Sequence, residues 1–332
     1  MISELKIKTV AVGVLALMAS GFTLAAQDEL PSIKGKAEVQ IHAAEPSPSL
    51  LTTQMLGSAR TSSGRIVAVG DHGVIALSDD NGASFRQARA VPVDTTLTAV
   101  SFVDRDNGWA VGHGGVIIHT TDGGEHWALQ RKDLAVDQPL FGVYFKDRQN
   151  GWAVGLWSLM LQTKDGGSNW EVVKAPIPPG AKKADRNFFS VFGDDKERIY
   201  VSCEQGLVLR STDGGATWSY VQTGYEGSLW AGLVLPDGAV LVGGLRGNIY
   251  RSDDGASTWT HSTDDFRSSV TDLSAGPSGT VIASALDGVV LESHDDGKTF
   301  HGTQRSAREP LTAVSVTNGG KPVLFSQAGI LK

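Results

Sequence analysis

Short stretches in which apolar and polar residues alternate follow one another along most of the chain, separated by turns rich in glycine, asparagine and aspartate. A period of two residues indicates a half-buried β-strand, and short glycine-containing turns join such strands into hairpins. One clear unit has strands over residues 97–104, 109–112, 116–120 and 127–131. The pattern predicts a four-stranded antiparallel meander.

This unit recurs, and an octapeptide between its third and fourth strands marks each copy. The octapeptide reads Ser/Thr-x-Asp-x-Gly/Ala-x-x-Trp/Phe, as in Thr120 to Trp127. Its aspartates are Asp80, Asp122, Asp165, Asp213, Asp254 and Asp295, spaced 41 to 48 residues apart. A period near 40 residues with four strands in each copy is typical of a β-propeller, in which every copy forms one blade.

The repeated aspartates raise the question of a metal or a catalytic acid. A catalytic residue does not need six equivalent copies, whereas an ionised carboxylate can accept backbone N–H groups within a tight turn. The octapeptide resembles the Asp box, a turn motif of sialidases, sortilins and related propellers. We therefore interpret the six aspartates as structural and predict no catalytic residue, metal or cofactor.

A seventh copy lacks the octapeptide and supplies only three strands, at residues 311–316, 322–326 and 330–331. An exposed sheet edge invites aggregation, so we expect another segment to complete this blade. Residues 38–43 alternate as a strand would and lie within an otherwise polar leader, residues 27–49. We predict an all-β, seven-bladed propeller over residues 50–332, closed by an N-terminal strand that completes the last blade.

Residues 1–26 have the layout of a secretory signal peptide. Lys6 and Lys8 precede an apolar run over residues 10–24, and Ala25 and Ala26 offer a cleavage site. The run is short for a bilayer span, which disfavours the alternative of an uncleaved anchor. We expect export to a periplasm. The single cysteine excludes an intramolecular disulfide, and a net charge of −7 argues against nucleic acid as a partner.

Two copies carry a longer motif that points to a family. Residues 104–112 read DRDNGWAVG and residues 147–155 read DRQNGWAVG, and each is followed by Thr-x-Asp-Gly-Gly-x-x-Trp. These motifs resemble those of the photosystem II stability/assembly factor propellers. The resemblance implies a non-enzymatic assembly factor; in photosynthetic organisms, its partners are photosystem II reaction-centre polypeptides. For this chain it implies a monomer that binds a membrane protein, or an exported loop or tail of one.

A site should lie where the blades differ, on the face that carries the turns between second and third strands. Trp157 replaces a glycine in one such turn, and the second position of the first strand is aromatic only in copies 3 to 5. The insertion at residues 174–186 carries four basic residues against one acidic residue. We predict a partner-binding surface made of Trp157, Phe141, Phe189, Trp230, Arg246, Lys174, Lys182, Lys183 and Arg186. The alternatives are that the three first-strand aromatics are inter-blade core and that the insertion is merely solvated.

Two further functions stay open at this stage. A sialidase-like glycoside hydrolase or carbohydrate-binding propeller would share the Asp boxes, but Arg246 is the only arginine in the second-to-third-strand turns, and Tyr225 and Glu226 are adjacent rather than opposed. An accessory subunit of an envelope transport complex would use the same surface as an assembly factor. His72 and His113 could contribute to a metal site, but they match no ligand motif.

Overall fold

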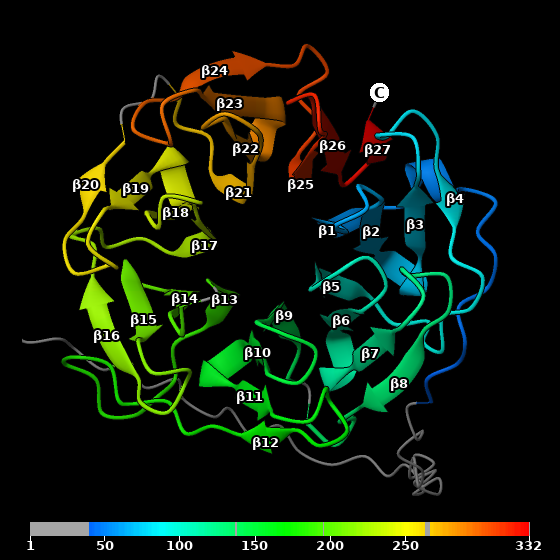
Figure 1. The fold of residues 1–332 in the computed structure, drawn as a ribbon, viewed down its shortest axis with the longest axis horizontal. Helices are drawn as coiled ribbons and strands as arrows, with labels where there is room; N and C mark the ends of the chain where they lie inside the picture. The colour runs from blue at the N-terminus through cyan, green and yellow to red at the C-terminus, as the bar shows by residue number, and fades with distance from the viewer. Residues whose placement is uncertain (1–39, 137, 195, 263–265, 332) are drawn as a thin grey trace, which may run out of the picture. The chain divides into compact units, whose positions relative to one another are not determined.

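The computed structural model describes residues 40–331 except 137, 195 and 263–265. The predicted signal peptide, most of the leader, and residues 38 and 39 therefore lie outside the described part of the chain. The compact unit Gln40–Lys332 forms seven antiparallel sheets arranged as a ring, which confirms the seven-bladed all-β propeller (Figure 1). Within the described residues, no helix is long and apolar enough to cross a membrane.

Six blades have four strands in sequence order, and the seventh has three. The strands are β1 (Met55–Arg60), β2 (Ile66–Gly70), β3 (Ile75–Ser78), β4 (Arg86–Gln87); β5 (Leu97–Phe102), β6 (Gly108–Gly112), β7 (Ile117–Thr120), β8 (Ala128–Arg131); β9 (Leu140–Phe145), β10 (Gly151–Gly155), β11 (Met160–Thr163), β12 (Glu171–Val172); β13 (Phe188–Gly193), β14 (Ile199–Cys203), β15 (Leu207–Ser211), β16 (Ser219–Gln222); β17 (Leu229–Val234), β18 (Val240–Gly244), β19 (Ile249–Ser252), β20 (Thr260–His261); β21 (Val270–Ala275), β22 (Val281–Ala285), β23 (Val289–Ser293), β24 (His301–Gln304); and β25 (Leu311–Val316), β26 (Pro322–Ser326), β27 (Gly329–Leu331). Short 3₁₀ turns are η1 (Leu50–Thr52), η2 (Asp71–Gly73), η3 (His113–Gly115), η4 (Leu156–Ser158), η5 (Leu245–Gly247) and η6 (Leu286–Gly288).

The second strand of each four-stranded blade is buried along its whole length, because a neighbouring blade covers each face of the sheet. These strands are accordingly apolar or small along their length rather than alternating, with Ser202 and Ser284 as the buried polar residues among them. The tryptophans of the two NGWAVG motifs, Trp109 and Trp152, are essentially fully buried. Trp109 stacks on Phe145 of the next blade, with 3.5 Å between ring centroids. The most recognisable sequence motif is thus an inter-blade packing motif.

Each Asp box forms its own closed network of hydrogen bonds. In the fourth blade, Oδ1 of Asp213 accepts the backbone N–H of Thr217 and the hydroxyl of Ser211, and Oδ2 accepts the Thr217 hydroxyl. The Ser211 hydroxyl oxygen in turn accepts the N–H of Gly215. The other five boxes repeat the pattern. The hydrogen bonds from Thr217 lower the pKa of Asp213 to about 2, as expected for a carboxylate that is held ionised.

Replacing one of these aspartates tests their structural role. Asp295→Ala removes four acceptor contacts: to the Ser293 hydroxyl, to the N–H of Lys298, and to the N–H and hydroxyl of Thr299. We expect a loss of about 1–2 kcal/mol, which lowers Tm by about 2–4 °C in a domain of this size. Differential scanning calorimetry checks this. The neighbouring Asp296→Asn is the control, because Asn tolerates the positive φ of 60° at that position; a similar loss in both variants would contradict the assigned role of Asp295.

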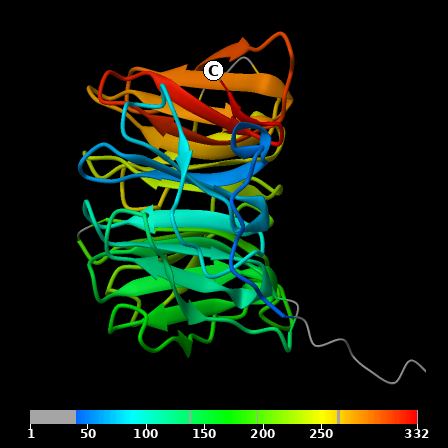
Figure 2. The same ribbon diagram turned by 90° about the vertical axis from the view of Figure 1, so that its right-hand side faces the viewer.

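The predicted N-terminal closing strand is wrong in the part that the structure describes. Residues 40–43 belong to no strand, and the last sheet consists of β25, β26 and β27. The segment instead follows the linker between the first two blades: Ala44 N–H donates to Val91 O (3.0 Å), and His42 N–H donates to Asp94 Oδ1 (3.1 Å). Figure 2 shows this segment, in blue, running along the outside of the ring toward β1.

The ring closes through contacts between β1 and β25, which lie next to each other in Figure 1. Thr312 donates its hydroxyl hydrogen bond to Met55 O (2.5 Å), and the Ser58 and Ser315 hydroxyls are 2.9 Å apart. The three-residue strand β27 is contacted by η1, and the backbone of Leu51 approaches Gly329 so closely that a Cβ there would meet Leu51 O at 2.1 Å. The last edge is therefore short and covered by η1, and it needs no fourth strand.

Candidate partner-binding face and central channel

The turns between second and third strands lie at the end of the ring where the innermost strands begin. In six of the seven blades, the first N–H of the turn donates to the carbonyl of the residue that precedes the inner strand, as in His113 to Thr96 (3.0 Å), Leu156 to Pro139 (3.1 Å) and Leu245 to Ser228 (3.0 Å). We call this end the turn face. The Asp boxes lie at the opposite end, since they join the third and fourth strands.

Trp157 is the most prominent apolar side chain in these turns, with 57% of its surface exposed. It occupies the middle of η4 at φ 54°, a left-handed conformation that glycine adopts with less strain and that is unusual for a bulky residue. Its N–H donates to Asn187 Oδ1 (3.1 Å), and Asn187 donates to both carboxylate oxygens of Glu204 in the next blade. The turn is therefore fixed by its neighbours while the indole stays in solvent.

The basic insertion is attached to the same turn. Both the N–H and the hydroxyl of Ser158 donate to Arg186 O, at 2.7 and 3.0 Å. Lys174, Lys182 and Lys183 are exposed, and Lys183 lies 3.6 Å from Asp185. Arg186 differs from the expected free cation, because it is largely buried and pairs with Asp185 at 3.0 Å. The structure thus joins the Trp157 turn to the insertion, in which three of the four basic residues are exposed.

Arg246 lies apart from this group. It is exposed at the centre of η5, where its N–H donates to Ser269 Oγ (3.1 Å). It borders a hollow between the fourth and fifth blades, lined by Gly224, Tyr225, Glu226, Gly227 and Leu245. The Tyr225 hydroxyl donates to Leu245 O (2.9 Å), so this tyrosine is engaged by the backbone rather than paired with Glu226. In the described residues, no group of three or more His, Cys, Asp or Glu side chains is arranged to hold a metal ion.

The three first-strand aromatics line the central channel and are only half buried, so they are neither inter-blade core nor part of the outer surface. Each inner strand has a β-bulge at its second residue. A bulge redirects a side chain out of the pleat. The seven bulged residues all line the channel: Leu56, Thr98, Phe141, Phe189, Trp230, Thr271 and Thr312.

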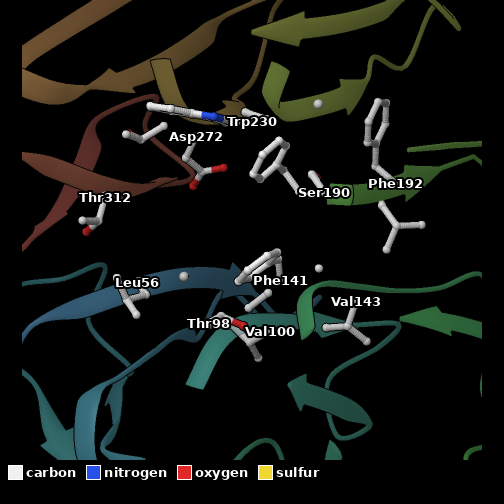
Figure 3. A pocket seen from close by; sticks show the side chains of 18 of the residues that line it. Leu56, Thr98, Val100, Phe141, Val143, Ser190, Phe192, Trp230, Asp272 and Thr312 are labelled. Carbon is white, nitrogen blue, oxygen red and sulfur yellow. The ribbon is translucent and has the colours of Figure 1, made fainter. Parts of the chain in front are cut away.

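One channel residue was not predicted from the sequence. Asp272 follows the bulge of β21, and Figure 3 shows its carboxylate directed into the channel near Trp230 and Thr312. Burial raises its pKa to about 7, although the N–H groups of Val314 and Leu273 donate to it at 3.0 and 2.8 Å. The equivalent residues are Gly57, Ala99, Gly142, Ser190, Ala231 and Ala313. An aspartate in a column of small residues is the signal that could have identified it.

The fold and the Asp boxes define the class of protein: a seven-bladed Asp-box propeller with a distinctive turn face. The family described as photosynthesis system II assembly factor YCF48 matches residues 87–139 and 128–331. The chain belongs to this family.

Solved structures show the same fold at low sequence identity. YCF48 bound to D1 peptide is 18% identical over 87% of this chain and 95% of its own, with a TM-score of 0.66. YCF48 from Cyanidioschyzon merolae is 15% identical over 86% and 96%, with a TM-score of 0.65. A streptogramin B lyase is 11% identical over 87% and 96%, with a TM-score of 0.69. Since one of these propellers is an enzyme, the fold alone does not decide the function. No curated protein matches the sequence.

Proposed function

We propose that this chain is an exported, non-enzymatic propeller that binds a segment of a membrane protein and assists its assembly or stability. The family is that of an assembly factor, and one structurally similar YCF48 is bound to a D1 peptide. Export, with a periplasmic location, is proposed from the signal-peptide pattern of residues 1–26.

The observation that carries the proposal is the exposed Trp157 in a turn to which the basic insertion is hydrogen-bonded through Ser158 and Arg186. A bulky residue held at positive φ costs on the order of 1 kcal/mol or more, and such strain is concentrated at functional sites. Tryptophan is also enriched among the residues that dominate binding energy at protein interfaces. The insertion that is hydrogen-bonded to this turn carries the exposed Lys174, Lys182 and Lys183 on an otherwise acidic protein. This chemistry fits an extended partner segment that offers an apolar side chain and carboxylates.

Cross-linking capture from the cell envelope tests this surface. We expect tagged wild type to capture one membrane complex. The variant Trp157→Ala/Lys182→Glu/Lys183→Glu should capture at least tenfold less of that complex, because the substitutions remove the apolar anchor and reverse the local charge. The control is Lys164→Glu/Lys298→Glu, which changes exposed lysines in Asp-box turns on the opposite face.

Equal capture by all three proteins would refute the surface and keep the function. Capture of no protein by wild type would refute the assembly role. Hydrolysis of a fluorogenic sialoside above the blank would instead favour the glycoside hydrolase alternative.

A further inference from the structure

The channel beside the turn face encloses a cavity of about 210 Å³ whose wall is chemically divided. Three consecutive blades contribute Phe141, Phe189 and Trp230, and the Phe141 and Phe189 rings stack with 6.2 Å between centroids. The other four blades contribute Thr98, Thr271, Thr312 and Asp272, together with Leu56 from β1. Figure 3 shows Trp230, Phe141 and Asp272 around the same open space. A channel that served only as a water-filled axis would not need this division.

The polar half presents acceptors rather than donors. The hydroxyls of Thr98 and Thr312 donate to backbone carbonyls, at 2.7 and 2.5 Å, which leaves acceptor positions on their oxygens. The Thr271 hydroxyl is within hydrogen-bond distance of both Ser284 O and the Ser284 hydroxyl, at 3.0 Å each. A carboxylate has about four acceptor positions, and the two N–H groups on Asp272 occupy two of them. A hydrogen-bond donor is therefore the complementary ligand group.

No positive charge in the cavity balances Asp272. The lining residues within the described chain come from all seven inner strands and include no Lys, Arg or His, and Asp272 is the single titratable side chain among them. A buried carboxylate without a cationic partner is costly. Its pKa is raised to about 7, which agrees with this lack of compensation. A bound cation would provide the missing charge.

The aromatic half favours the same kind of ligand. The face of an aromatic ring attracts a cation within about 6 Å, and tryptophan does so most strongly. The cavity is smaller than the roughly 300–1,000 Å³ of pockets for drug-sized ligands, so it suits a small amine or one side chain. We propose that the channel binds an organic monocation, an ammonium or guanidinium group on an apolar stem, with its charge on Asp272 and its stem against Phe141, Phe189 and Trp230. This site goes beyond the proposed function, since a free amine needs no protein partner.

Calorimetric titration of the purified protein with benzylamine and with benzyl alcohol tests the site. The two probes have nearly the same shape, and only benzylamine is charged. At pH 8 we expect wild type to bind benzylammonium at least tenfold more tightly than the alcohol, and Asp272→Asn to reduce this preference to about twofold. Trp230→Leu should weaken benzylammonium binding about tenfold. Circular dichroism of each variant verifies folding.

A second measurement needs no variant. Benzylamine stays charged between pH 6 and 8 while Asp272 ionises, so its affinity for wild type should rise about tenfold over this range. Equal affinity for the two probes, an unchanged preference in folded Asp272→Asn, or no saturable binding of the amine would overturn the proposal.

A third titration, with a lysine-containing peptide, identifies the source of the cation. Acetyl-Gly-Lys-Gly-amide that binds at least as tightly as benzylamine, with the same dependence on Asp272, would indicate a lysine of a protein. Binding of benzylamine alone would indicate a free amine. Both results support a cation site, and neither depends on the capture experiment described above.

Discussion

Trp109→Ala is expected to cause the largest loss of stability of any single substitution considered. The indole is fully buried, stacks on His119 and Phe145, and donates its N–H to Gly166 O of the adjacent Asp box at 3.2 Å. Removing a buried tryptophan leaves a large cavity, for which the usual cost is about 3–5 kcal/mol. Because Trp109 joins two blades, we expect the loss to affect the whole ring rather than one blade.

The measurement is Tm by scanning calorimetry at a fixed scan rate, with an expected decrease of about 5–8 °C. Trp157→Ala is the matched control, because it deletes an indole that is exposed to solvent rather than buried. It should change the free energy of unfolding by no more than about 0.5 kcal/mol. If Tm decreased equally in the two variants, Trp109 would not stabilise the packing between blades more than the exposed Trp157 does, which would contradict both assignments.

The sequence predicts the number of blades well because every blade repeats the same turn chemistry. Six Asp boxes and their glycine turns each specify a hairpin locally, and neighbouring blades then have one way to pack. The closing strand failed for the opposite reason. The alternation in residues 38–43 indicates a strand-like period but does not specify a partner edge, and the backbone contact of Ala44 with Val91 depends on the position of a distant linker.

The site was predicted in part for a related reason. Trp157 and the basic insertion were identified because they break the repeat, and the structure joins them through Ser158 and Arg186. The insertion gives the linker enough length to approach a serine where most blades have glycine. That Arg186 is paired with Asp185 could not be known from composition. The channel position of Phe141, Phe189 and Trp230 results from a β-bulge, which changes side-chain direction without leaving a clear mark in the sequence.

Asp272→Asn is expected to change how stability depends on pH. The unfolded carboxyl ionises near 3.9, and the folded one near 7, because burial raises its pKa. The folded state therefore holds the proton more tightly. The stability that this proton contributes to wild type is complete below about pH 4 and is lost as the pH rises through 7. Between pH 5 and 8 the loss amounts to about 2–3 kcal/mol in wild type. Asp272→Asn cannot show this loss of stability, because the asparagine side chain does not ionise in this range.

Urea unfolding of both proteins at pH 5 and pH 8 measures this difference. The free energy of unfolding of Asp272→Asn minus that of wild type should increase by about 2–3 kcal/mol from pH 5 to pH 8, because only wild type loses stability over this range. Asp287→Asn is a control in the same blade: its ion pair with Arg308 lowers the pKa of Asp287, so its contribution changes only below about pH 4. A relative stability of Asp272→Asn that is the same at both pH values would refute the raised pKa.

The same experiment connects stability to the channel ligand. At pH 8 wild type carries an uncompensated carboxylate, and a cation that binds only the folded state stabilises it by mass action. Saturating benzylamine should therefore recover part of the stability that wild type loses between pH 5 and 8 and leave Asp272→Asn unchanged. If benzylamine stabilises both proteins equally, it binds elsewhere, and the carboxylate is then a structural acceptor for the N–H groups of Val314 and Leu273. The pH dependence and the ligand dependence separate these two roles of one residue.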